Sequence, residues 1–155
     1  LKIDPHNLFG HICIESRFLP AGPTAIDMAA NAAFYLGLQQ FYQTRLCLDQ
    51  YARTNLYQAA IHGLDATLIW QCKPIKAQTL VQDILIDQCH QGLQQLKCDP
   101  KDIHTYLSII QERCLKKQTG SHWQIAWKEK RGLHDLLAQY HRWQNLDVPV
   151  HLWDI

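Results

Sequence analysis

Apolar residues recur along most of this chain at the spacing of an α-helix. Over about 24–45 they share one helical face, and the many alanines together with Gly37 indicate close packing against another element. The same periodicity predicts further helices, among them a short one after Thr119-Gly120 that carries Trp123 and Trp127. The others cover about 48–62, 76–97, 100–117 and 131–146.

Helix ends are marked by particular residues. Thr24 is the expected N-cap of the first helix, and Asp27, three residues later, comes close to completing a capping box. Asp99 followed by Pro100 predicts the start of the fourth helix, and Gly63 the end of the second. Ser121 is the expected N-cap of the helix that carries Trp123. Gly92 is an expected weak point within the helix over 76–97.

The helical periodicity also predicts which side chains face inward. In the second helix these are Leu48, Ala52, Leu56, Ala59 and Ala60. In the last helix they are Leu133, Leu136, Leu137 and Tyr140.

One firm strand is predicted, at about 11–18. Leu64–Trp70 is predicted to be a short extended segment, and Pro74 is predicted to close the loop that follows it. The tail over 148–155 is predicted to form an edge strand. The fold class is therefore helix-dominated α+β, with five or six helices. The strand at 11–18 has no evident partner, so we expect the 155 residues to form a single domain whose sheet is completed by a missing N-terminal half.

Composition narrows the classes of function. The chain is 47% apolar and only 19% charged, which is typical of a folded protein rather than a disordered one. A net charge of +1 gives no electrostatic basis for binding nucleic acid or an anionic membrane, and no apolar run is long enough to span a bilayer. The six cysteines lack zinc spacing, which predicts reduced thiols in a cytoplasmic protein.

Glu15 and Arg17 are the most informative polar pair. Because they lie two residues apart in the predicted strand, both side chains point to the same side. A carboxylate can bind a hard cation and a guanidinium can neutralise phosphate, so this pair beside the N-terminus of a helix suits a metal-bound polyphosphate. The alternative is an ion pair at a sheet edge, which contributes little.

Asn55 has both a structural and a functional interpretation. It falls on or beside the predicted inner face of the second helix, with Arg53 nearby, so its amide needs either a buried hydrogen bond or a ligand.

Four segments, in this order, resemble the carboxylate–amine ligases of the glutamate–cysteine ligase type. ESRFLPAGPTAIDMAANAAFYLGL is similar to that family's E-x-R strand and alanine-rich helix. RTNLYQAAIHGLDATLI is similar to its Arg/Asn-rich helix and Gly-Leu-Asp-Ala turn. IIQERCLKKQTGSHWQ and PVHLW resemble its later segments.

The resemblance implies an ATP-dependent ligase that makes γ-glutamylcysteine through an acyl-phosphate, in glutathione biosynthesis. It implies the C-terminal portion of a glutamine-synthetase-like catalytic fold that uses ATP and Mg²⁺. Glu15 matches a magnesium ligand and Arg17 the catalytic arginine on the transferred phosphoryl group. Arg53, Asn55 and Trp123 would contact the nucleotide or cofactor, and the partners are glutamate and cysteine or another amine. Thr119, Gly120 and Gln124 would share the wall around the nucleotide or substrate with Trp123, for which the alternative is a core residue.

The family takes most of its metal and glutamate ligands from an N-terminal half that has no counterpart here. We therefore expect these residues to have little or no activity without that half. Two alternatives stay open: the same scaffold acting on another substrate pair, and a helical interaction module without catalysis. The substrates and the oligomeric state, including a homo-oligomer, are not determined by the sequence.

Overall fold

The structure is a computed structural model that describes residues 22–44 and 50–155. The predicted strand at 11–18, with Glu15 and Arg17, lies outside the described residues. The described elements are α1 (Ala25–Tyr42), α2 (Ala52–His62), η1 (Gly63–Asp65), β1 (Thr67–Trp70), β2 (Lys73–Lys76), α3 (Ala77–Leu80), η2 (Val81–Leu85), α4 (Ile86–Gln95), α5 (Pro100–Leu115), α6 (Gly120–Arg131), α7 (Leu133–Asn145) and η3 (Val150–Leu152). Helices dominate and the one described sheet is a two-stranded antiparallel hairpin, so the α+β, helix-dominated class is confirmed.

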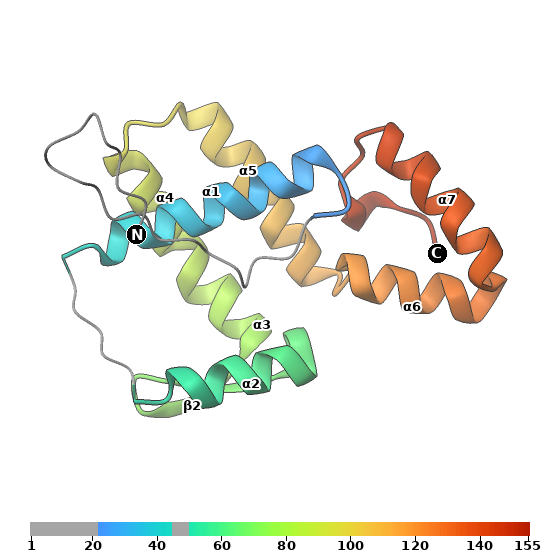
Figure 1. The fold of residues 1–155 in the computed structure, drawn as a ribbon. Coiled ribbons are helices and arrows are strands. Elements are labelled where there is room, and N and C mark those ends of the chain that lie inside the picture. The colour runs from blue at the N-terminus through green and yellow to red at the C-terminus, as the bar shows by residue number, and fades with distance from the viewer. Residues whose placement is uncertain (1–21, 45–49) are drawn as a thin grey trace, which may run out of the picture.

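Helix α1 runs through the middle of the molecule and packs mainly against α4 and α5 (Figure 1). It crosses α4 at two glycines: a Cβ added to Gly92 would lie 1.8 Å from the Gly37 carbonyl oxygen, and one added to Gly37 would lie 2.4 Å from Cys89 Sγ. The predicted close packing at Gly37 is confirmed. At Gly92 only a residue without a side chain fits this crossing, and the prediction that this glycine weakens its helix stays a prediction.

Two apolar clusters lie in different parts of the molecule. Between α1, α4 and α5, the first contains the buried residues Cys89, Leu93, Ile103 and Leu107. At the C-terminal end, the second surrounds the Trp123 ring and contains Leu136, Val150 and Trp153. Figure 1 shows α6 and α7 together at one end of the molecule, with α2 and the hairpin along its lower edge.

The predicted helix over 76–97 is one continuous rod made of α3, η2 and α4. Its middle part, η2, is a π-helical turn. The fourth helix begins as predicted, because Asp99 accepts a hydrogen bond from the Lys101 amide with Pro100 in the first turn. Helix α6 is capped by Thr119, which accepts from the His122 amide, so the expected cap at Ser121 is wrong.

Several predicted faces and strands are also wrong. Helix α2 has no buried residue: Ala52, Leu56, Ala59 and Ala60 are all exposed. In α7 the prediction is confirmed for Leu136, which is buried, and for Tyr140, which packs against the same cluster, whereas Leu133 and Leu137 face solvent. Pro74 lies inside β2 rather than in a loop, and the tail forms the 3₁₀ turn η3 instead of an edge strand. No helix among the described residues is long and apolar enough to cross a membrane.

Candidate functional site

A buried carboxylate joins three distant parts of the chain. Asp27, in the first turn of α1, is completely buried, and its Oδ1 accepts a hydrogen bond from Arg113 Nη2 of α5 at 2.8 Å. Its Oδ2 accepts from the Val150 amide at 3.1 Å and from Thr24 Oγ1 at 2.9 Å. The guanidinium also donates to Asn31 Oδ1 at 2.7 Å. We call Thr24, Asp27, Asn31, Arg113 and Val150 the Asp27 junction.

Residues of the same region accept hydrogen bonds from the free backbone amide groups at the N-terminus of α1. Thr24 Oγ1 accepts from the Asp27 amide at 3.2 Å, which confirms the predicted N-cap. Asp147, which precedes η3, accepts from the Ile26 amide at 3.1 Å. The capping-box expectation is only half right, because the Asp27 carboxylate binds the Thr24 hydroxyl, Arg113 and Val150.

The electrostatics of the junction follow from burial. Desolvation lowers the pKa of Arg113, and the Asp27 charge opposes that shift. Burial raises the pKa of Tyr140, and the negative charge of Asp27 adds to the effect. A buried ion pair that loses one partner typically destabilises a protein by about 3–5 kcal/mol, so the junction is a point on which the fold depends.

Gln118 and Trp123 extend the junction towards the end of the chain. The Gln118 amide group donates to the carbonyl oxygens of Val150 at 2.8 Å and Trp153 at 2.6 Å. Trp123 Nε1 donates to the carbonyl oxygen of Asp154 at 2.8 Å. The turn between α5 and α6 is thereby tied to η3.

A second, exposed cluster lies where η1 approaches the start of α6. Lys117 Nζ is 2.5 Å from Asp65 Oδ1, and Lys76 Nζ donates to the Asp65 carbonyl oxygen at 3.3 Å. The hydrogen bond and charge of Lys117 lower the pKa of Asp65, with smaller contributions from His122 and Lys76. On the same turn, Thr119 Oγ1 lies 2.8 Å from His122 Nδ1.

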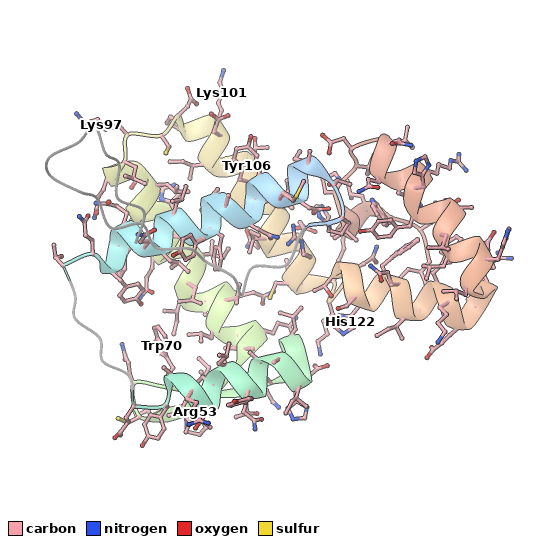
Figure 2. The ribbon with its side chains drawn as sticks, in the orientation of Figure 1. Arg53, Trp70, Lys97, Lys101, Tyr106 and His122 are labelled. Carbon is pink, nitrogen blue, oxygen red and sulfur yellow. The ribbon has the colours of Figure 1, made fainter. Side chains whose placement is uncertain are left out.

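The structure does not bring the predicted cofactor residues together. Arg53 is exposed on α2, with its guanidinium carbon 5.9 Å from the centre of the Tyr57 ring. Figure 2 shows Arg53 far from His122, which neighbours Trp123 in the sequence at the start of α6. The ring of Trp123 is completely buried and packs against Trp127, with ring centres 5.2 Å apart, and against Trp153 at 4.8 Å.

Asn55 has a clear structural contact. Its side-chain amide donates to the Ile69 carbonyl oxygen and accepts from the Ile69 amide, both at 2.8 Å, so it pairs with β1 as another strand residue would. The structural interpretations of Asn55 and Trp123 therefore have direct support. Their role toward a nucleotide stays a prediction.

Potential metal ligands are scattered among the described residues. They include no group of three or more His, Cys, Asp or Glu side chains that could hold a metal ion. The one carboxylate buried among them, Asp27, already accepts hydrogen bonds on both oxygens from protein donors. The predicted magnesium ligand, Glu15, and the predicted catalytic residue, Arg17, lie outside the described residues.

A shallow groove of about 200 Å³ lies between α4 and α5. Its buried floor is formed by Ile103 and Leu107, and polar side chains such as Asp87, His90 and His104 surround it. None of the residues predicted for the site lines this groove. Comparisons of the chain with protein-family models, with curated proteins and with solved structures found no match.

Proposed function

We propose that this chain is the C-terminal part of the catalytic fold of an ATP-dependent carboxylate–amine ligase of the glutamate–cysteine type. One observation carries the proposal: the four segments on which the resemblance rests are held together by side-chain hydrogen bonds. The contacts place these segments in one framework, as a shared catalytic scaffold requires.

The contacts link the segments pairwise. Asp27 of the first segment binds Arg113 of the third and Val150 of the fourth. Asp65, in the Gly-Leu-Asp-Ala turn of the second segment, binds Lys117 of the third. Gln118 of the third segment binds two carbonyl oxygens within and beside η3. The segments most similar to the family therefore form one connected framework.

The chemistry of the proposed reaction assigns roles to the first segment. The γ-carboxylate of glutamate would take the terminal phosphoryl group of ATP, and the amine of cysteine would then displace phosphate to form the amide. In this proposal Glu15 binds magnesium, which neutralises phosphate charge, and Arg17 contacts the transferred phosphoryl group. Phosphoryl transfer depends mainly on positioning and charge neutralisation, so these are the residue types that it requires.

The framework fixes the start of the helix in the first segment. Pro23 and Thr24 are buried, and Thr24 is hydrogen-bonded to Asp27, so α1 begins at a fixed point. Arg17 is seven positions before Thr24 in the sequence.

The test is ADP release in the presence of ATP, Mg²⁺, glutamate and cysteine. We would assay the chain itself and the longest product of its natural reading frame. The proposal expects turnover that falls about 10²–10³-fold in Glu15→Gln and in Arg17→Met, a typical effect of removing one such contact. Glu129→Gln, which changes an exposed glutamate on α6, is the matched control and should leave the rate unchanged.

Absence of turnover with glutamate and each of the common amino acids as acceptor would overturn the ligase proposal. Turnover with an acceptor other than cysteine would identify the same scaffold acting on another substrate pair. We also propose a cytoplasmic location, because Cys72, Cys89, Cys98 and Cys114 are all free thiols.

One observation favours the second candidate, a helical interaction module without catalysis. Helix α2 exposes Leu56, Tyr57 and Ile61, which are 59%, 55% and 69% accessible. Large apolar side chains gathered on one exposed helix are typical of a contact surface. If Glu15→Gln leaves every measured function unchanged, this candidate takes precedence.

A further inference from the structure

We propose that the imidazole of His151 is an acid-sensitive latch, which releases η3 from the Asp27 junction when it takes up a proton. His151 lies in η3 directly after Val150, whose amide is bound by Asp27. Its own carbonyl oxygen accepts from Lys116 Nζ at 3.4 Å. The residue therefore lies at the point where the end of the chain is fastened to α1 and α5, whichever function the protein has.

The imidazole fits this place only in its neutral form. His151 is 8% exposed, and within the described part of the chain its Nδ1 has no hydrogen-bond partner. A protonated imidazole carries a hydrogen on both ring nitrogens. Protonation in place would therefore bury both a charge and a donor without an acceptor, which is strongly unfavourable.

The surrounding charges do not offset burial. The described charged groups that act on the ring are Asp27 on α1, Glu112 and Arg113 on α5, and Lys116 directly after α5. The two carboxylates favour the protonated ring, but the two cations oppose it and burial has the largest effect. Both oxygens of Asp27 already accept hydrogen bonds, and Glu112 Oε2 lies 3.7 Å from Lys116 Nζ, so each carboxylate already has a partner.

Burial, followed by the positive charge of Lys116, lowers the pKa of His151 below its ordinary value of 6.5. Once η3 opens, the ring regains that ordinary value and binds a proton more readily. Opening is therefore rare at neutral pH and increases as the pH falls below about 6.5, by up to about tenfold per pH unit for one proton. Opening also removes the Val150 amide from Asp27, so the Asp27 carboxylate loses one of its three hydrogen-bond donors.

Hydrogen exchange measured by mass spectrometry tests the latch directly. We would compare peptides that cover 148–155 at pH 7.5 and pH 5.0, with rates corrected for intrinsic exchange. The wild-type chain should lose protection in this segment at pH 5.0, by up to about 30-fold, the limit for uptake of one proton over this pH range, whereas α4 and α5 should stay protected. The variant His151→Gln should show less than a twofold change.

The matched control is His134→Gln, which changes an exposed histidine on α7 and should keep the full acid response. An acid response in His151→Gln equal to that of the wild type would overturn the proposal, as would its absence in the wild type. If His151→Gln does not fold, an NMR titration of wild-type His151 replaces it. Proton uptake by the ring should coincide with loss of η3 protection, and titration without that loss would overturn the latch.

Discussion

Helix α1 takes part in two contacts of opposite character. In its second half it crosses α4 at Gly37 and Gly92, where backbone meets backbone and there is no room for a side chain. In its first turn it joins α5 and η3 through the charge of Asp27. Adding a side chain at the crossing should lower the stability of the protein. At the junction, removing a hydrogen-bond partner should lower it. The following variants test that difference.

The largest effect is expected at the junction. Asp27→Ala leaves the Arg113 guanidinium buried without its anion and the Val150 amide without its acceptor. We expect a loss of about 3–5 kcal/mol in the free energy of unfolding, measured by urea denaturation. Asp83→Ala, an exposed aspartate on η2, is the control and should change stability by less than about 0.5 kcal/mol.

The double variant Asp27→Leu with Arg113→Met sharpens this comparison. Because it removes both charges together, it should be clearly more stable than Asp27→Ala. If Asp27→Ala alone costs less than about 1 kcal/mol, the junction does not hold the fold as we describe.

The next effect is expected at the helix crossing. Gly92→Ala places a Cβ against the Gly37 carbonyl, so α1 and α4 must move apart, at a cost of about 1–3 kcal/mol. Burial raises the pKa of the Cys89 thiol to about 12, which keeps it unreactive in the closed crossing. A thiol reagent at pH 8 should therefore modify Cys89 faster in this variant. Gln91→Ala, on the exposed side of α4, should leave both measurements unchanged.

A smaller effect is expected at Gln118. Gln118→Ala removes both hydrogen bonds to η3 and leaves the two carbonyl oxygens of Val150 and Trp153 without this donor. We expect a loss of about 1–2 kcal/mol in thermal or urea unfolding. Gln144→Ala, on the exposed side of α7, is the matched control. Equal stability of the two variants would show that the α5–α6 turn does not depend on η3.

The smallest effect is expected at the exposed pair of Lys117 and Asp65. Lys117→Ala should not measurably change the free energy of unfolding, because both side chains are hydrated. It should instead return the pKa of Asp65 toward its ordinary value of 3.8, which an NMR titration of the carboxyl group measures. With the folded pKa depressed, any contribution of the pair is present above pH 3.8 and is lost as the pH falls. An unchanged titration would contradict this assignment.

Local signals in the sequence predicted the local structure well. The N-cap at Thr24, the start of α5 at Asp99 and the close approach at Gly37 all depend on a few neighbouring residues, and all are confirmed. The predicted inner face is wrong for α2 and for half of the residues named in α7, because periodicity shows that apolar residues share a face but not that another element covers it.

The junction could be predicted only in part. Asp27 was marked by its place after Thr24, and Arg113 is three residues after the buried Ile110, which puts an arginine at the edge of an apolar face. That combination signals a buried partner, but nothing local says that the partner is 86 positions away. The tail was predicted wrongly for the same reason, since Val150 and Trp153 are fixed by contacts with Asp27 and Gln118.

The bond between Asp27 and Val150 spans 123 positions of sequence, and this separation has a consequence for biosynthesis. A ribosome delivers the chain from its N-terminus, so α1 exists long before its last partner does. Until Val150 emerges, the Asp27 carboxylate lacks one of its three hydrogen-bond donors, and the start of α1 cannot pack in its final form. Maturation of this protein should therefore be completed after translation has passed Val150, with the glycine crossing formed earlier and the junction closed last.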